Sequence, residues 1–304
     1  MVVIGGGVIA AEFSHVFSAF GTEVTQLNRS SRLLRGVDEE VVARFEEAAS
    51  KQWNIVKDAS LSEIRENADG SVTVVAKRTT ENGEELLEIP ADAVLVATGR
   101  RPNTDTLNAK NYFDVQDGGQ LSVDKYQRVL YNGAPVPGVY ALGDVSSRYQ
   151  LKHVANHEAR VVQHNLSHPE DLRASDHRYV PAAVFSNPQI AVVGMTEEQA
   201  RQAAEREGFE ITVKAQNFGD TAYGWAMEDK IGLCKLIARK DNGVLLGAHL
   251  VGEESSVLIQ PLLQAMSFGM DARTLARGQY WIHPALTEII ENALLGLEFD
   301  EPAN

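Results

Sequence analysis

The apolar positions at the start of the chain follow a strand, turn and helix pattern. The β-formers Val2–Ile4 run directly into a cluster of glycines. The next segment, Ala10–Phe17, repeats apolar residues at helical spacing, and Glu23–Leu27 follows as a second strand at the distance that a βαβ unit requires. The pattern predicts a βαβ unit, the building block of a parallel sheet.

The same kind of pattern continues to residue 98. Glu39–Lys51 is an amphipathic helix, with Asp38 placed to cap its start, and Asn54–Val56 returns as a strand. Three β-segments separated by hairpin turns follow. The all-apolar run Ala93–Ala97 then predicts a buried strand, so we expect an α/β, Rossmann-like domain.

From residue 177 the pattern changes to short strands and helices of a different unit. Strands are predicted over residues 183–185, 190–193, 210–215, 231–238 and 244–251, and helices over 196–207, 253–268 and 271–276. We expect an antiparallel sheet covered on one face by helices. The chain is therefore predicted to have an NAD(P)H-binding domain over residues 1–98, a central segment over 99–176 and an α+β domain over 177–304.

The glycine cluster carries the first candidate chemistry. Gly5-x-Gly7-x-x-Ala10 has the spacing of a dinucleotide-binding turn. Gly5 permits the turn, Gly7 lets backbone N–H groups approach a pyrophosphate, and the small Ala10 lets helix and strand pack closely. The helix then directs its positive N-terminal end at the phosphates. An ordinary strand-to-helix turn is the alternative.

The loop after the second predicted strand indicates which dinucleotide binds. An acid at this strand end accepts from the 2′-OH of NADH, whereas arginine accommodates the 2′-phosphate of NADPH. This chain has Asn28 and Arg29 there, with Arg32 and Arg35 close behind. We therefore predict NADPH as the cofactor, with a solvated basic loop as the alternative.

Composition narrows the class of protein. With 28 basic and 42 acidic residues the net charge is −14, which argues against nucleic acid or an anionic membrane as partner. No apolar run is long enough to cross a bilayer and no leader-like segment is recognisable, so we expect a cytoplasmic chain. Cys234, the only cysteine, lies in an apolar strand and is expected to be buried rather than reactive.

Two later motifs make the chain resemble a known family. Val94–Asn103 reads Val-Leu-Val-Ala-Thr-Gly-Arg-Arg-Pro-Asn, and Val139–Asp144 is a short strand that ends in Gly-Asp. Together with the glycine turn they resemble the flavin-dependent pyridine nucleotide–disulfide oxidoreductases, the family of glutathione reductase and dihydrolipoamide dehydrogenase. The resemblance covers essentially the whole chain. It implies FAD as a second cofactor and a position for Glu12 near the nicotinamide pocket.

The resemblance also implies a flavin-facing surface in the central segment. Asp144, after Gly143, would accept a hydrogen bond from a ribityl hydroxyl, and we expect its carboxylate to be buried. The start of the next helix would lie beneath the isoalloxazine ring. The remaining cofactor-binding residues implied in this way are Gly99, His153, Val154 and Ala155. Histidines four residues apart in this helix also have metal-ligand spacing, but no suitable third ligand is nearby and we predict no metal site.

The last motif surrounds His283. Pro284 is expected to begin a helix, so that Glu288 folds back to the imidazole. Histidine exchanges protons near neutral pH, and a carboxylate on its second nitrogen fixes the tautomer. In the resembling family such a pair is the acid–base catalyst for the dithiol and leaving thiol of the other subunit, which implies a homodimer through the C-terminal domain. A helix start with a solvated histidine is the alternative.

The family places an FAD-binding domain and a redox-active cysteine pair ahead of the stretch where this chain begins. We therefore expect a C-terminal fragment that is inactive when isolated. Within the family, the segment after His283 resembles the mycothione reductases most. The predicted activity is NADPH- and FAD-dependent reduction of a small disulfide, mycothione to mycothiol. A dihydrolipoamide dehydrogenase-like or glutathione reductase-like enzyme, and a non-catalytic dinucleotide-binding and dimerisation module, are the alternatives.

Overall fold

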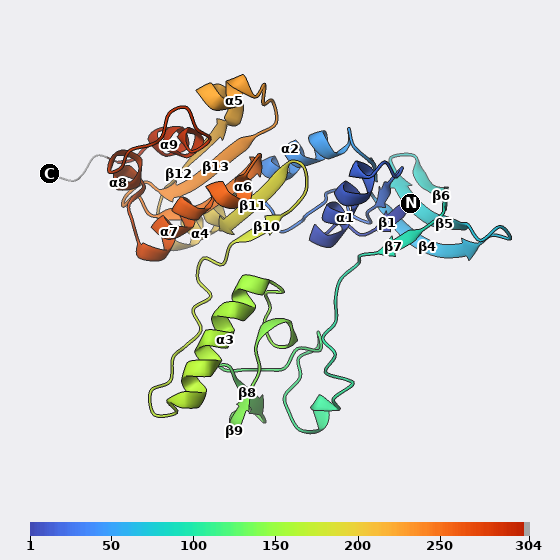
Figure 1. Ribbon diagram of the computed structural model, residues 1–304, viewed down its shortest axis with the longest axis horizontal. Coiled ribbons are helices and arrows are strands. Elements are labelled where there is room, and N and C mark those ends of the chain that lie inside the picture. The colour runs from blue at the N-terminus through green and yellow to red at the C-terminus, as the bar shows by residue number, and fades with distance from the viewer. Residues whose placement is uncertain (301–304) are drawn as a thin grey trace. The chain divides into compact units, whose positions relative to one another are not determined.

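The computed structural model describes residues 1–300, which form two compact units (Figure 1). Unit 1 combines Met1–Thr98 with the chain from Pro181 onward, and unit 2 comprises Gly99–Val180. Residues 301–304, at the end of the predicted C-terminal domain, lie outside the described residues. The two units meet in sequence close to the predicted boundaries, and the division into three domains stays a prediction.

The N-terminal part of unit 1 contains a parallel sheet in the order β3-β2-β1-β7. Its strands are β1 (Val2–Ile4), β2 (Thr25–Leu27), β3 (Asn54–Val56) and β7 (Val94–Val96). Helix α1 (Val8–Ala19) connects β1 to β2, and α2 (Glu39–Ala49) connects β2 to β3. Because each of these parallel pairs is joined by a helical crossover, the α/β fold class is confirmed.

Between β3 and β7 the chain forms a three-stranded antiparallel meander in the order β4-β5-β6. Its strands are β4 (Ala59–Glu66), β5 (Val72–Thr80) and β6 (Gly83–Ala91). The expectation that the strand after it is fully buried is wrong, since Val96 is 61% exposed. The physical reason is that β7 is an edge strand, paired only with β1.

Unit 2 is built from a β-hairpin and one long helix. Its elements are the 3₁₀ helix η1 (Ala109–Asn111), β8 (Arg128–Tyr131), β9 (Ala134–Tyr140), the 3₁₀ helix η2 (Gly143–Val145) and α3 (Lys152–Ser167). A small core of Leu121, Val129 and Ala141 holds the loops together. Helix α3 packs against η2, so the predicted Gly-Asp turn and the predicted helix start adjoin.

The C-terminal part of unit 1 is an antiparallel sheet in the order β10-β11-β14-β13-β12. Its strands are β10 (Ala182–Val184), β11 (Gln189–Gly194), β12 (Ile211–Asn217), β13 (Leu233–Arg239) and β14 (Leu245–Gly252). Its helices are α4 (Glu197–Glu207), η3 (Phe218–Asp220), α5 (Ala222–Ala226), α6 (Ser255–Leu258), α7 (Gln260–Phe268), α8 (Ala272–Arg277) and α9 (Glu288–Leu295). Within residues 1–300, no helix combines the length and apolar content that crossing a bilayer demands.

Helices lie against both faces of this sheet, so the predicted cover of one face is incomplete. Gly296, just after α9, lies against the Lys214 side chain, which shares a face with Leu236. Lys235 points to the opposite face, where its ammonium group contacts Asp38 at the start of α2 and Glu197 at the start of α4, at 3.0 and 2.7 Å. Helix α2 of the N-terminal part therefore packs on the C-terminal sheet (Figure 1).

The ammonium group of Lys235 pairs with three carboxylates in this contact, those of Asp38, Glu40 and Glu197. Burial alone would raise the pKa of Asp38, but a hydrogen bond from the backbone N–H of Glu197 and the neighbouring Lys235 ammonium hold that pKa below its usual range. Burial likewise works against a charged Lys235, yet its bonds to Glu197 and Asp38 raise its pKa. Removing Lys235 would leave the buried Asp38 carboxylate without its cation, so this cluster fixes α2 on the sheet.

Candidate functional sites

The first glycine of the β1–α1 turn, Gly5, is required by the backbone conformation and by the packing of neighbouring strands. Gly5 has φ +143°, and a Cβ there would lie 2.3 Å from the Ala97 carbonyl oxygen. Its N–H donates to the Leu27 carbonyl at 2.9 Å, and its carbonyl accepts from Gln26 Nε2 at 3.0 Å. Only glycine fits this conformation, so the turn is locked against β2 and β7.

Gly7 differs, because nothing in the protein occupies the space next to it. A Cβ at Gly7 would meet no atom within 4 Å, whereas Ala10 is fully buried against Gly5. Gly7 is the N-cap of α1, and no side chain among the described residues caps this helix. The turn therefore presents an open backbone surface with N–H donors at a helix N-terminus, which suits a phosphate group.

Beside this turn lies the arginine loop, which we define as residues 28–37. Arg29 and Arg35 are exposed, and Arg32 donates from its guanidinium to the Arg35 carbonyl at 3.0 Å. Within residues 1–300, none of these arginines has an acidic side chain within ion-pair distance. The Leu34 N–H donates to the Gly6 carbonyl at 2.8 Å, so the cationic loop is held directly against the glycine turn.

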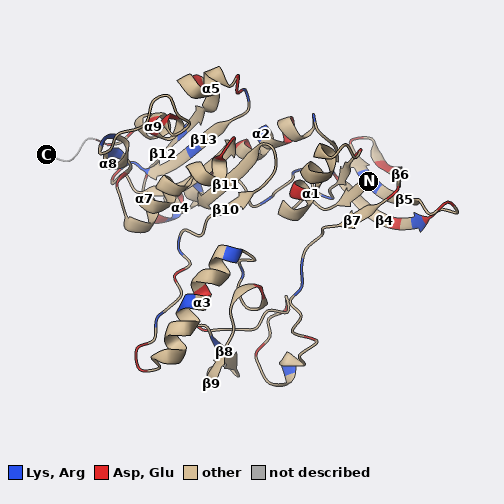
Figure 2. Cartoon of the chain, viewed as in Figure 1, with Lys and Arg blue, Asp and Glu red and all other residues tan. Residues whose placement is uncertain are grey.

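Glu12 has a partner that the sequence did not indicate. It is the only acidic residue of α1, where it forms the red segment in Figure 2. Its Oε1 accepts a hydrogen bond from the Phe185 N–H at 2.9 Å. Glu12 thus ties α1 to the chain just after β10, and its position near a nicotinamide stays a prediction.

His283 and Glu288 lie side by side in unit 1. His283 Nδ1 is 2.7 Å from Glu288 Oε1, and the second oxygen of Glu288 accepts from the Ala285 N–H at 3.3 Å. The hydrogen bond with His283 lowers the pKa of the Glu288 carboxyl. The imidazole is 67% exposed. The arrangement orients His283 with Nε2 available for proton exchange.

The expected helix start at Pro284 is wrong. Helix α9 begins at Glu288 with Thr287 as its N-cap residue, and residues 284–287 form turns. The reason is local: the Glu288 carboxylate folds back on the Ala285 N–H and on His283, and the backbone between them therefore turns before the helix begins.

In unit 2 the Gly-Asp turn is held by a buried acid. Gly143 has φ +68°, and a Cβ there would lie 3.3 Å from the Ala155 Cβ. The Gly143 N–H donates to Glu158 Oε2 at 2.6 Å, and its carbonyl accepts from the Ser147 N–H at 2.8 Å. The turn is therefore fixed against the first turns of α3.

Asp144 is exposed in this structure, and its contact with a flavin stays a prediction. Its side chain is 54% exposed, and the nearest cation, Arg100, lies 3.8 Å away. The carboxylate faces solvent, where hydration satisfies it without a buried partner. Of the neighbouring predicted residues, Val154 is buried and His153 is exposed. Gly99 has φ +138° with open space beside it.

Sequence reasoning missed Glu158 and His177. Glu158 is fully buried although it is the only acidic residue of α3 (red in Figure 2). Its Oε1 lies 2.9 Å from His177 Nε2 while its other oxygen holds Gly143. A signal was present, because Glu158 shares the helical face of Val154 and Val161. A lone acid on an apolar face has to find buried donors.

The histidine and cysteine side chains form no metal or redox centre in residues 1–300. No group of three or more histidine, cysteine, aspartate or glutamate side chains there has the geometry to hold a metal ion. His164 and His168 stack on each other with ring centroids 4.7 Å apart. The predicted burial of Cys234 is confirmed, and burial raises the pKa of its thiol to about 12.

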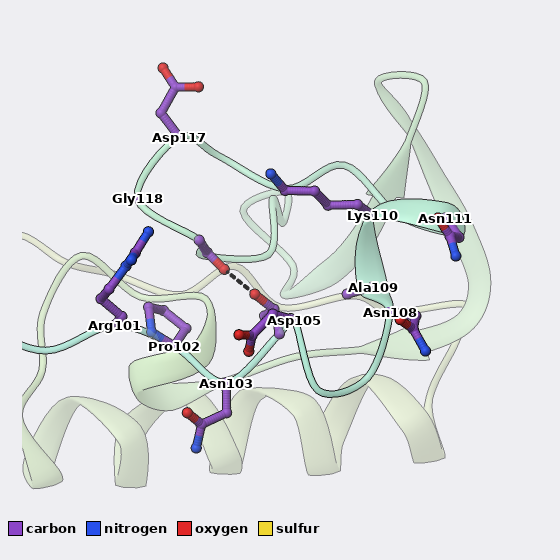
Figure 3. Close-up of a pocket in the computed structure, with 12 residues that line it drawn as sticks. Arg101, Pro102, Asn103, Asp105, Asn108, Ala109, Lys110, Asn111, Asp117 and Gly118 are labelled. Carbon is purple, nitrogen blue, oxygen red and sulfur yellow. Dashed lines mark hydrogen bonds between the residues drawn. The ribbon is translucent and has the colours of Figure 1, made fainter.

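Unit 2 also contains a pocket of about 430 Å³ that was not predicted (Figure 3). It is formed by the loop Arg101–Asp105, the 3₁₀ helix η1 and the glycines 118–119. A hydrogen bond of 2.6 Å from Thr104 Oγ1 to the Gly119 carbonyl joins two of the segments that line it. Because two basic and two acidic residues line it, the pocket has no net charge to select an anionic ligand.

Two family profiles match the chain. Residues 1–159 match the pyridine nucleotide-disulphide oxidoreductase profile, and residues 180–294 match the dimerisation domain of the same family. The chain belongs to the pyridine nucleotide-disulphide oxidoreductase family. The glycine turn, the arginine loop, Asp144 and the start of α3 lie in the first matched region, and the His283–Glu288 pair lies in the second.

Individual relatives agree with the family. The chain is 52% identical to a mycothione reductase of Mycobacterium tuberculosis, over 98% of this chain and 62% of that protein. It is 32% identical to a mercuric reductase of Staphylococcus aureus, over 99% of this chain and 52% of that protein. Among solved structures, the HOCl-induced flavoprotein disulfide reductase RclA of Escherichia coli, a Cu(II) complex, superposes with a TM-score of 0.83. There the identity is 27%, and the match covers 97% of this chain and 63% of that one. The chain thus spans less than two thirds of the length of these relatives.

Proposed function

We propose that the chain binds NADPH through the glycine turn and the arginine loop. The observation that carries the proposal is the pairing of an open helix N-terminus at Gly7 with two exposed arginines that have no acidic partner in residues 1–300. In a chain of net charge −14, arginines without an acidic partner beside an open helix N-terminus favour an anionic ligand. The 2′-phosphate of NADPH supplies a second anionic group beyond the pyrophosphate.

We propose that unit 2 contributes part of an FAD site. The residues fit this role in two respects: Asp144 offers an exposed carboxylate to hydroxyl donors, and α3 begins without a side-chain cap among the described residues. Glu158 holds the Gly143 backbone, so the turn that carries Asp144 is preorganised. Asp144 and the start of α3 would hold the FAD, which would supply two-electron transfer between a nicotinamide and a disulfide.

We propose that His283 exchanges protons with the thiol groups of the reaction. Reduction of a disulfide by NADPH consumes one further proton and yields two thiols and NADP⁺. Glu288 holds Nδ1, so Nε2 of His283 is the atom that gives a proton to a departing thiolate. The redox disulfide has to come from outside these residues, since Cys234 is their only cysteine.

The proposed enzyme is a cytoplasmic homodimer that reduces a small disulfide, and the proposed substrate is mycothione. The match to a dimerisation domain supports the dimer, and the 52% identity to a mycothione reductase supports the substrate. The domains would divide as NAD(P)H-binding over 1–98, flavin-contacting over 99–176 and dimerisation over 177–304. A non-catalytic dinucleotide-binding and dimerisation module is the second candidate for the isolated chain, because its one thiol is buried.

A chimera tests these proposals. In it, this chain replaces the residues that it matches in the M. tuberculosis mycothione reductase. We expect the chimera to bind FAD and to oxidise NADPH with mycothione at least tenfold faster than with glutathione disulfide or lipoamide. Faster NADPH oxidation with another disulfide would contradict mycothione as the proposed substrate. A chimera that binds FAD but oxidises NADH as fast as NADPH would overturn the cofactor assignment, and the isolated chain without turnover would match the second candidate.

A further inference from the structure

The arginine loop is held from inside by the Asn28 side chain. Asn28 Nδ2 donates to the Ser30 carbonyl at 2.8 Å and to the Arg32 carbonyl at 3.1 Å. Asn28 itself is 5% exposed. Two donors from one buried amide therefore set the curve of the backbone that carries Arg29 and Arg32.

A second support comes from helix α2. Glu46 Oε1 accepts a hydrogen bond from the Leu33 N–H at 2.8 Å, and Glu46 Oε2 pairs with Lys57 at 2.7 Å. Leu33 and Leu34 are buried in the core between α1 and α2. Leu34 has φ +45°, a conformation that a leucine keeps only when its surroundings determine it. The middle of the loop is therefore held in two ways: the leucine side chains pack in the core, and the Leu33 backbone N–H bonds to Glu46.

The loop and the glycine turn also fit each other sterically. A Cβ at Gly6 would lie 2.3 Å from Asn28 Oδ1. Gly6 is therefore glycine because the Asn28 amide occupies the space above it. Asn28 fills the gap between the turn and the loop, and none of its atoms lies within 4 Å of a Cβ placed at Gly7.

The chemistry of an amide is essential in this position. An aspartate of the same shape has no N–H donors, and its carboxylate would face the carbonyl oxygens of Ser30 and Arg32. Such a contact is repulsive, so the loop would open. The arginines would then lose their fixed positions beside the turn.

We propose that Asn28 and Glu46 are positioning residues that set the preference for NADPH by holding Arg29 and Arg35 in a preformed site for the 2′-phosphate. Neither residue touches the nucleotide. The inference rests on the proposed binding of NADPH. A preformed loop raises the affinity for NADPH, because a loop that is already ordered without ligand loses less conformational entropy on binding.

The order of the loop can be measured without any nucleotide. Trypsin cleaves after arginine, so cleavage after Arg29, Arg32 and Arg35, followed by peptide mass spectrometry, reports how often the loop opens. We expect Asn28→Ala and Glu46→Leu to be cut about tenfold faster than the wild type. Glu46→Gln keeps an acceptor oxygen and restores slow cleavage. Glu47→Leu is the matched control, because Glu47 lies on the same helix and loses an ion pair of its own, with Lys51.

Nucleotide affinity completes the test. We expect Asn28→Ala and Glu46→Leu to weaken NADPH binding about tenfold in titration calorimetry while NADH binding changes less than threefold. If the wild type prefers NADPH but both variants keep its preference and its cleavage rate, the positioning role is wrong. If the wild type binds NADPH and NADH equally, both the NADPH assignment and the positioning role are wrong. The wild-type affinities therefore distinguish a failure of the NADPH assignment from a failure of the positioning role alone. If Asn28→Ala does not fold, the Glu46 variants still decide the result, because Glu46→Gln keeps the shape and the acceptor oxygen of this half-buried side chain.

Discussion

Two of the histidine–carboxylate pairs in residues 1–300 differ in burial and in the histidine nitrogen that faces the acid. In unit 2, Glu158 is 1% exposed and lies 2.9 Å from Nε2 of His177. In unit 1, Glu288 is 17% exposed and lies 2.7 Å from Nδ1 of His283. In both pairs the second carboxylate oxygen accepts a hydrogen bond from a backbone N–H. Glu158 accepts from Gly143, and Glu288 accepts from Ala285. The same two functional groups are thus placed in opposite environments.

The difference separates a structural pair from a chemical one. Glu158 is buried although His177 is 29% exposed, and the pair holds the Gly143 turn in shape. Removing the carboxylate would leave the buried Gly143 N–H without an acceptor. Around His283 the imidazole is exposed, and the flanking Tyr280 and Ile282 are exposed as well. A histidine oriented by a carboxylate but open on its other nitrogen can exchange protons with a group brought to it. In the proposed homodimer, the partner subunit would bring such a group to His283.

The largest expected effect separates the pairs by turnover. In the chimera with the M. tuberculosis mycothione reductase, His283→Gln should lower kcat for disulfide reduction by roughly 10²–10⁴-fold, because general acid catalysis is lost. Reduction of bound flavin by NADPH, followed by stopped-flow absorbance, should stay at the rate of the parent chimera. His177→Gln should instead lower the thermal midpoint. Turnover of the His283 variant within threefold of the parent would contradict the assignment.

The next effect separates the pairs by stability. Glu158→Leu should cost about 3 kcal/mol of local opening free energy in unit 2, because the Gly143 N–H and His177 are left without an acceptor. Glu288→Leu should cost below about 1 kcal/mol, because its partner His283 is 67% exposed. Hydrogen exchange of peptides from α3 and α9 measures each region separately. Equal costs for the two substitutions would contradict a mainly structural role for the Glu158–His177 pair.

Local chemistry explains why much of the fold was predictable. The glycine turn, the cap at Asp38 and the capping box of Thr196 with Gln199 depend on residues a few positions apart, and the structure has all three. The same holds for His283 and Glu288, whose contact spans one turn of chain. Sequence spacing contains enough information for such features.

Contacts over long sequence separations could not be predicted in this way. Glu12 meets Phe185 across 173 residues, and Lys235 meets Asp38 across 197. Each polar group was visible as an oddity, for example a lysine inside the apolar strand β13, but its partner depends on how α2 packs on the sheet. Likewise, the exposure of Val96 follows from the edge position of β7, which no local pattern contains.

The smallest expected effect concerns pH and tests the open pair alone. The pKa of Glu288 is lowered from 4.5 by His283, so the stabilisation from this pair is fully present above pH 4.5 and is lost as pH falls through the lower folded pKa. Because the imidazole is exposed, the gain is below about 0.5 kcal/mol. Carbon-13 NMR titration of the Glu288 carboxyl should give a midpoint below 4.5 that moves upward in His283→Ala. It should not return fully, since the Ala285 N–H still donates to Glu288. An unchanged midpoint would mean that His283 is not held by this acid in solution, and its role as an oriented proton donor would then lack its structural basis.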